Sequence, residues 1–103
     1  MRKVRFLAAA EAEANEATAY FDAQRNGLGD RFEQDLQDTI DFVREHPLSG
    51  KQLRKLARKF RLRVFRYNVV YIYVADDDEI IIVAVAHHRR RPDYWRGRLK
   101  MMR

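Results

Sequence analysis

Two adjacent histidines, three consecutive arginines, a tyrosine and a tryptophan lie within nine residues, from His87 to Trp95. Histidine exchanges protons near neutral pH, and arginine binds phosphate and carboxylate groups through several hydrogen bonds at once. Tyr94 and Trp95 add flat rings that stack on a partner or anchor a segment. This stretch follows directly on the apolar run from Ile80 to Ala86. It therefore lies where a buried strand reaches solvent, a usual place for binding and catalytic groups. An ordinary basic strand end is the alternative interpretation.

Charge is divided unevenly along the chain, and the division narrows the class of partner. Residues 1–50 contain six Lys and Arg against ten Asp and Glu, a net charge of −4. Residues 51–103 contain fifteen against five, a net charge of +10, which gives +6 for the whole chain. The division predicts a basic protein with an acidic helical side and a basic sheet side. A basic face attracts nucleic-acid phosphates or an acidic protein.

The composition also argues against several kinds of site. The chain has no cysteine, and hence no disulfide, no thiolate metal site and no cysteine nucleophile. It shows no pair of carboxylates, no metal-spaced His/Asp set and no glycine-rich phosphate loop, so we expect neither a metal nor a cofactor. No apolar run has the length of a signal-peptide core or a membrane span. We therefore expect a cytoplasmic protein of one domain, residues 1–103, that does not contact a membrane.

Hydrophobic periodicity predicts the elements that position the 87–95 stretch. We expect, in order, a strand at 3–7, a helix from about 8 to 25, a helix from 30 to 46, and strands at 60–65, 68–75 and 79–86. The connector 51–59 has no clear pattern. These elements predict an α+β fold in which a helical hairpin packs on a small antiparallel sheet, in the order β-α-α-β-β-β with a short C-terminal tail. The strand at 80–86 is apolar at nearly every position, which indicates a central strand covered on both faces.

Particular side chains follow from the same patterns. We expect the first helix to bury Ala10, Ala14, Ala17, Tyr20 and Phe21, and the second to bury Phe32, Leu36, Ile40 and Val43. Asp30 and Glu33 are spaced as an approximate capping box at the start of the second helix. In the strand 60–65, alternation places Phe60, Leu62 and Val64 on one face and Arg61 and Arg63 on the other. Alternation also predicts that one of the two neighbouring histidines packs inward.

Four motifs follow one another along the chain: GLGDRF at 27–32, EHP at 45–47, RYNVVY at 66–71 and HHRRRPDYW at 87–95. In this order they resemble the RelE/ParE superfamily of toxins from type II toxin–antitoxin modules, and the resemblance covers nearly the whole chain. It implies a growth-inhibiting toxin that a cognate antitoxin, ParD-like or similar, neutralises in a hetero-oligomer. Such antitoxins fold a segment onto the toxin, and we expect a groove at the helical hairpin and the sheet edge to receive it.

The superfamily divides by target. ParE-like members, to which plasmid stabilisation proteins belong, inhibit DNA gyrase, whereas RelE-like members cleave messenger RNA on the ribosome. The resemblance places the nucleases' third-strand arginine at Asn68, and the arginine near the end of their fourth strand at His87 or His88. RNA cleavage needs a base, a phosphate-binding cation and an acid in reach of one another. Because that set is incomplete, we favour a gyrase inhibitor that is not an enzyme.

Three alternatives remain. In an endoribonuclease, His88 would be the acid, Arg90 the phosphate clamp and Tyr94 a stacking or proton-transfer group. A relic that only binds its antitoxin and a plain nucleic-acid-binding module are the others. For the gyrase interpretation, the expected target-binding residues are Arg61, Arg63, His87, Arg89, Arg91, Trp95, Arg96 and Arg98. We also expect Tyr94 and Trp95 to pin the C-terminal tail, with Arg96, Arg98, Lys100 and Arg103 exposed.

Overall fold

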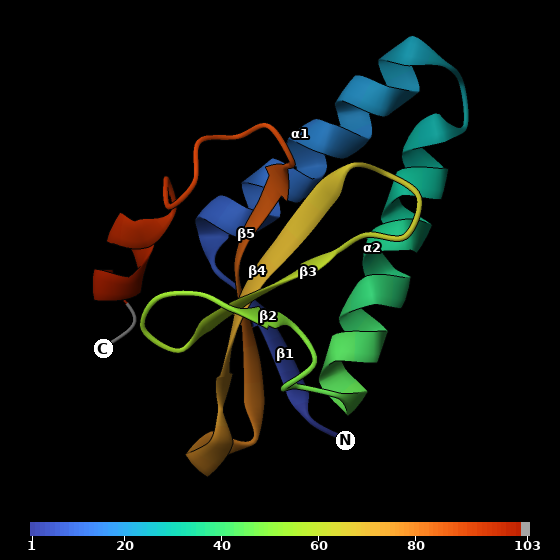
Figure 1. Cartoon of the computed structure of the whole chain (residues 1–103). Helices are drawn as coiled ribbons and strands as arrows, with labels where there is room; N and C mark the ends of the chain where they lie inside the picture. Colours follow the sequence, from blue (N-terminus) through green and yellow to red (C-terminus); the bar gives the residue numbers. More distant parts are fainter. Residues whose placement is uncertain (102–103) are drawn as a thin grey trace.

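Two antiparallel helices cover one face of a five-stranded sheet in the computed structural model, which describes residues 1–101 (Figure 1). The elements are β1 (Lys3–Phe6), α1 (Ala8–Gln24), α2 (Leu28–Glu45), β2 (Lys51–Gln52), β3 (Ala57–Arg61), β4 (Tyr67–Val74), the 3-10 turn η1 (Ala75–Asp77), β5 (Glu79–His87) and the 3-10 segment η2 (Arg96–Met101). The predicted α+β class and the order of its main elements are confirmed. The connector without a clear pattern adds the short strand β2.

The sheet has the order β1-β5-β4-β3-β2, and it is mixed because β1 runs parallel to β5 while the other neighbours are antiparallel. β1 pairs only with Glu79–Ile82, so β5 has an uncovered edge from Val83 onward among the described elements. The register of β4 and β5 shifts there, since Val70 pairs with Ala84 and Tyr71 with Ile82. Val83 is therefore the extra residue of a bulge, which lies where the edge of β5 becomes uncovered.

The helices bury most of the positions that their periodicity predicts. In α2 all four stripe residues are buried, and Phe32 and Val43 have no exposed surface. In α1 the alanines at 10 and 17 are buried and Phe21 packs on the core, but Tyr20 is 57% exposed, so its predicted burial is wrong. Tyr20 lies one residue before Phe21 on the helix, and Phe21, whose ring carries no hydroxyl, takes the inward place against Phe32.

The turn between the helices differs from the expected capping box. Helix α2 begins at Leu28, two residues before Asp30, and has no side-chain cap at its N-cap position. Instead the Asp22 carboxylate of α1 accepts a hydrogen bond from the backbone N–H of Gly29 (2.8 Å). Gly27 has φ 88°, a conformation that favours glycine, and a Cβ on Gly29 would lie 2.6 Å from the Thr18 carbonyl oxygen. The two glycines thus permit a close hairpin that Asp22 then holds.

The predicted strand at 60–65 is displaced, because a buried carboxylate takes the backbone donors of its second half. Asp35 of α2 accepts hydrogen bonds from the N–H groups of Arg63 (3.1 Å), Val64 (2.9 Å) and Phe65 (2.8 Å). These groups cannot also pair with a strand, so β3 ends at Arg61 and residues 62–66 form a loop. Leu62 is buried as expected, but Val64 is 65% exposed, which corrects its predicted inward position.

Apolar side chains fill both sides of the sheet. On the helix side, the core joins α1 and α2 to residues of β4 and β5 such as Tyr71, Ile80 and Ile82. On the other side, Trp95 packs with residues of β3, β4 and β5 beneath the C-terminal tail. The predicted burial of residues 80–86 on both faces is therefore confirmed. Figure 1 shows the tail on the opposite side of the sheet from α2.

Candidate functional site

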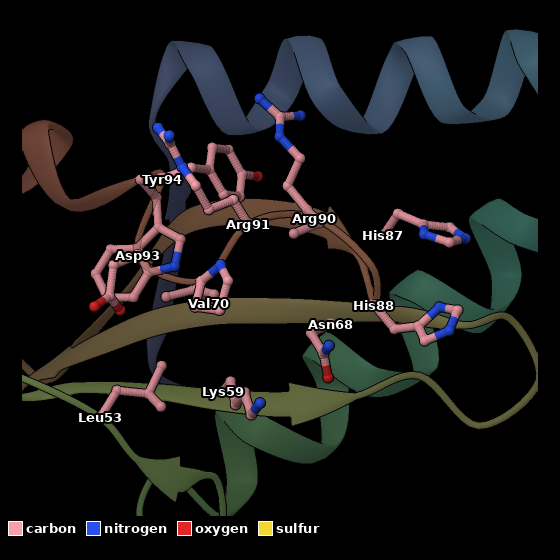
Figure 2. A pocket seen from close by; sticks show the side chains of 13 residues that line it. Leu53, Lys59, Asn68, Val70, His87, His88, Arg90, Arg91, Asp93 and Tyr94 are labelled. Atoms are coloured by element: carbon pink, nitrogen blue, oxygen red, sulfur yellow. The ribbon is translucent and has the colours of Figure 1, made fainter.

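A pocket of about 120 Å³ lies on the face of the sheet opposite the helices (Figure 2). The sheet contributes one wall, which includes Lys59 of β3 and Asn68 and Val70 of β4. The end of β5 and the turn that follows it form the other wall, with His88, Arg90, Arg91, Pro92, Asp93, Tyr94 and Trp95. The stretch identified in the sequence thus borders a concave site, together with a lysine from β3.

β3 adds positive charge to the same face. Arg61 pairs with Asn68, and Lys59 pairs with Val70, and directly paired residues point to one side of a sheet. The exposed Arg61 therefore lies beside the pocket, as its predicted role requires. Arg63 belongs to the 62–66 loop instead of a strand, and its side chain is exposed there while its backbone bonds to Asp35.

Both histidines are exposed, so the expectation that one of them packs inward is wrong. The β4–β5 pairing ends at Tyr67 and His87, and the chain turns immediately afterwards. The His87 ring stands edge-on to Tyr67 at 5.3 Å, while the His88 Nδ1 lies 3.3 Å from the Arg66 carbonyl oxygen. Desolvation, helped by electrostatic repulsion from its basic neighbours, lowers the pKa of His87, so this ring binds a proton less readily than a free histidine.

Glu13 of α1 joins the C-terminal residues to the helical side of the molecule. Its Oε2 accepts a hydrogen bond from the Tyr94 hydroxyl (2.6 Å), and its two oxygens accept from the Arg98 guanidinium (2.8 and 3.0 Å). Its Oε1 also accepts from the N–H of Val85 (3.0 Å), and Arg98 donates to the carbonyl of Val83 (3.0 Å). We call Glu13, Tyr94 and Arg98, with these two backbone contacts, the tail lock.

The hydrogen bonds of the tail lock set the protonation of its members. Burial alone would raise the pKa of the Glu13 carboxyl, but the bonds from Arg98, Tyr94 and Val85 outweigh burial and lower that pKa. Burial, reinforced by the hydrogen bond to Glu13, raises the pKa of the Tyr94 hydroxyl well above its usual range. At neutral pH, Glu13 is therefore ionised and Tyr94 keeps the proton that it donates.

Arg90 connects the tail lock to the basic turn. Its guanidinium carbon lies 3.9 Å from the centre of the Tyr94 ring, a cation–π arrangement, and Figure 2 shows its side chain pointing toward α1. Its backbone N–H donates to the carbonyl of His87 (2.9 Å) and closes the turn. Arg89 and Arg91 on either side are exposed. The cation–π contact therefore holds the central arginine of the three, while its two neighbours are exposed to solvent.

The tail combines buried and exposed members of the predicted target-binding set. Trp95 is only 4% exposed, so it anchors the tail and offers little surface to a target. Arg96 and Lys100 are exposed, as expected. The prediction that Arg98 stays exposed is wrong, because its side chain is 22% exposed and paired with Glu13 along the uncovered edge of β5. Arg103 lies outside the described residues.

Comparison with known proteins identifies the family of the chain. A family model described as the ParE toxin of type II toxin–antitoxin system, parDE, matches residues 4–92. The chain belongs to this family of toxins. The resemblance to RelE/ParE toxins inferred from four motifs is therefore confirmed. No curated protein sequence matches the toxin.

Solved structures agree with the toxin fold. A chain of the intact E. coli RelBE toxin–antitoxin complex has a TM-score of 0.67 at 20% identity, covering 87% of the toxin and 100% of that chain. The isolated E. coli RelE toxin gives 0.66 at 19% identity, covering 99% and 100%. The chromosomal ParDE system from P. aeruginosa gives 0.63 at 13% identity, covering 84% and 96%. At such identities the likeness concerns the fold alone, and it includes both branches of the superfamily.

Periodicity could have identified two important side chains that our sequence interpretation missed. Glu13 lies three residues after Ala10 and four before Ala17, so it belongs to the buried stripe of α1. Asp35 lies three residues after Phe32, on the buried stripe of α2. A carboxylate on a buried helix face requires hydrogen-bond donors, and that requirement is the signal that points to both.

Two further observations bear on the chemistry open to the toxin. Within residues 1–101, no group of three or more His, Cys, Asp or Glu side chains is placed to hold a metal ion. In that part of the chain, no helix is both long and apolar enough to cross a membrane.

Proposed function

We propose that the toxin stops growth by binding DNA gyrase, as a ParE-like inhibitor that catalyses no reaction, and that a cognate antitoxin neutralises it. The observation that carries this proposal is the hydrogen bond from the Tyr94 hydroxyl to Glu13. A tyrosine whose pKa is raised and whose proton is already committed is poorly suited to proton transfer. The residue that the nuclease interpretation needs as a proton-transfer group therefore serves to hold the tail.

The other candidate nuclease residues support the same choice. Arg90 belongs to the pocket wall, but its guanidinium stacks on Tyr94 and its side chain points toward α1, which engages the group that a phosphate clamp would need. Asn68, in the pocket wall, offers an amide where the nucleases have a charged arginine. An amide stabilises a phosphate transition state less well than a guanidinium. His88 therefore lacks two cationic groups that the nuclease interpretation expects beside it, the guanidinium of Arg90 and an arginine at position 68.

The surface that we assign to gyrase is the exposed positive charge around the pocket. Its charged members are Arg61, Arg63, Arg89, Arg91 and Arg96, and His87 lies among them as a polar group; all six are exposed. Trp95 and Arg98, from the same predicted set, act indirectly by holding the tail. Such a surface attracts an acidic protein face or DNA phosphates over long range, so binding should weaken as the salt concentration rises.

A RelE-like endoribonuclease is the second candidate, and one observation favours it. His88 and Lys59 border the same pocket, which brings together an imidazole and an ammonium group suited to act on a phosphodiester. In that case His88, Arg90 and Tyr94 would be the catalytic residues. A relic that retains only antitoxin binding is the third candidate.

The antitoxin partner is proposed from the family and from a groove on the helices. The titles of related structures describe toxin–antitoxin complexes of RelBE and ParDE. In the toxin, a groove of about 220 Å³ lies between α1 and α2, with Ala14, Leu36 and Ile40 among its lining residues. An amphipathic helix could place its apolar face there. Co-purification with the product of a neighbouring small gene tests this assignment, and toxin that purifies alone would contradict it.

The gyrase proposal is tested by inducing the toxin in cells and following two processes. Gyrase inhibition should induce the DNA-damage response while protein synthesis continues at early times. An endoribonuclease would stop protein synthesis within minutes and leave cut transcripts. Arg61→Ala and Arg89→Ala should each weaken growth arrest, with Arg25→Ala, an exposed arginine at the end of α1, as the control. Transcript cleavage that disappears in His88→Ala would overturn the proposal.

A further inference from the structure

We propose that Glu13 is a positioning residue for the target-binding surface, because it holds the C-terminal segment on the open edge of β5 and thereby fixes Arg90. This inference rests on the proposed function, since it concerns how the basic turn is presented to a target. Glu13 is on α1 and 81 residues away in sequence from Tyr94, so nothing in the local sequence of the turn reveals the dependence.

The edge of β5 that faces β1 is open over its second half. Beyond Ile82 no described strand pairs with β5 on the β1 side, yet the N–H of Val85 and the carbonyl of Val83 both have partners. Glu13 supplies one partner and Arg98 supplies the other. Backbone groups on an uncovered edge otherwise pair with solvent or recruit another strand. The carboxylate and the guanidinium thus replace a strand over this part of β5.

Tyr94 connects this edge to Arg90. The Tyr94 hydroxyl has Glu13 as its acceptor, and the face of the Tyr94 ring carries the Arg90 guanidinium at 3.9 Å. Without Glu13, Tyr94 loses its acceptor and Arg98 loses its counter-charge at the same time. The ring is then free to leave the edge, and Arg90 loses the platform that supports the turn carrying Arg89 and Arg91.

The tail lock is separate from the helix-side core. The helix-side core is built from α1, α2 and the sheet, and the ladders of β4 with β5 and of β1 with β5 do not involve Glu13. We therefore expect Glu13→Ala to fold with its helices and sheet intact. Trp95 is the single tryptophan and is 4% exposed where the tail packs on the sheet, so quenching of its fluorescence shows whether the tail stays in place while circular dichroism follows the helices and sheet.

The lock itself is tested with Glu13→Ala and Glu13→Gln, with Glu16→Ala as the control. Glu16 is an exposed carboxylate on the same helix, and its variant removes the same charge. We expect Glu13→Ala to raise quenching of Trp95 by acrylamide several-fold and to speed amide exchange at Val85 by about tenfold. Glu13→Gln should be intermediate, because its carbonyl oxygen still accepts a hydrogen bond. Far-UV circular dichroism should match the parent, and Glu16→Ala should leave both measurements unchanged.

A double variant, Glu13→Ala with Arg90→Ala, distinguishes a positioning role of Glu13 from a purely structural one. Toxicity is measured by counting viable cells after induction. If Glu13 acts through Arg90, each single variant loses toxicity and the double variant loses no more than the single ones. Losses that multiply in the double variant would overturn the proposal. So would reduced toxicity with Trp95 still protected, since Glu13 would then act by another route. If Glu13→Ala does not fold, Glu13→Gln replaces it in each comparison.

The same experiment distinguishes failure of this inference from failure of the proposed function. A parent chain that leaves growth unchanged at verified levels would remove the proposed function, and with it the role of Arg90. The quenching and exchange measurements would still show whether the lock exists. A parent chain that arrests growth, with Glu13→Ala equally toxic despite an exposed Trp95, would overturn the positioning role alone.

Discussion

Each of the two helices has one carboxylate on its sheet-facing side, and the two carboxylates hold different segments by different means. Asp35 of α2 accepts three hydrogen bonds, all from backbone N–H groups of the loop after β3. Glu13 of α1 accepts one from the backbone, at Val85, and the others from the side chains of Tyr94 and Arg98. The bonds to Asp35 depend only on the path of the backbone. The bonds to Glu13 depend mainly on which side chains occupy positions 94 and 98.

Because the two carboxylates have different partners, we expect the loop that carries Arg63 to be the fixed part of the basic surface and the C-terminal tail to be the adjustable part. The loop held by Asp35 presents Arg63 without depending on any loop side chain for its hydrogen bonds. The tail held by Glu13 depends on two particular partners and on the protonation of the carboxylate. We therefore expect the loop to follow the stability of the whole fold, and the tail to respond to substitution of Tyr94 or Arg98 and, through Glu13, to pH.

Asp35→Ala should have the largest effect on stability. The change leaves three backbone donors without their acceptor in a buried site, and we expect the free energy of unfolding to fall by roughly 2–4 kcal/mol. Urea unfolding followed by circular dichroism measures the change. Asp38→Ala is the control, because Asp38 is exposed on the same helix and bonds only to Gln34 among the described residues. Equal losses in the two variants would mean that Asp35 does not hold the loop.

Arg98→Ala should have the next largest effect and should act on the tail first. It removes the counter-charge of a mostly buried carboxylate, and we expect a loss of roughly 1–2 kcal/mol in the free energy of unfolding, together with greater quenching of Trp95. Arg96→Ala is the matched control, because Arg96 is two residues away and exposed. It should change stability by less than about 0.5 kcal/mol. Indistinguishable behaviour of the two variants would contradict the tail lock.

Acid should loosen the tail, because the tail lock depends on an ionised Glu13. The pKa of Glu13 is lowered on folding from its ordinary value of 4.5, so its charge stabilises the lock at pH values above about 4.5. As the pH falls through the lowered native pKa, Glu13 binds a proton and this stabilisation is lost. Trp95 quenching should therefore rise with acid before the helical signal falls. In Glu13→Gln that early rise should be absent; if it persists, another group controls the tail.

Tyr94→Phe should have the smallest effect on stability. It removes one hydrogen bond but keeps the ring on which Arg90 stacks, and we expect a loss of about 0.5–1.5 kcal/mol. Growth arrest should be largely retained, because Arg98 and the N–H of Val85 still bond to Glu13 and keep the tail, with its ring, on the edge of β5. Viable counts after induction make the measurement, with the parent chain expressed at the same level. Complete loss of toxicity from a folded Tyr94→Phe would favour Tyr94 as a proton-transfer group.

Sequence patterns predicted those features of the fold that depend on burial. The stripe of α2, with Phe32 and Val43 fully buried, follows from helical spacing, and the two-sided burial of residues 80–86 follows from a continuous apolar run. The end of α2 at Glu45 follows from the proline at 47. Each of these depends on the residue and its near neighbours, which is why a single sequence contains enough information.

Features that depend on distant hydrogen bonds could not be predicted in this way. The loop after β3 replaces half of an expected strand because Asp35, about 30 residues earlier, captures its N–H groups. Arg98 is paired instead of exposed because Glu13, 85 residues earlier, lies at the uncovered edge of β5. A polar side chain on a buried stripe indicates that some partner exists. Only the fold shows which one.

The most direct test of the proposed function uses the purified toxin on its two candidate targets. We predict that it inhibits supercoiling by purified DNA gyrase, that Arg61→Ala and Arg89→Ala weaken this inhibition, and that added salt weakens it too. We also predict that it leaves messenger RNA intact on purified ribosomes. Cleavage of ribosome-bound messenger RNA at toxin concentrations that leave gyrase fully active would contradict the account.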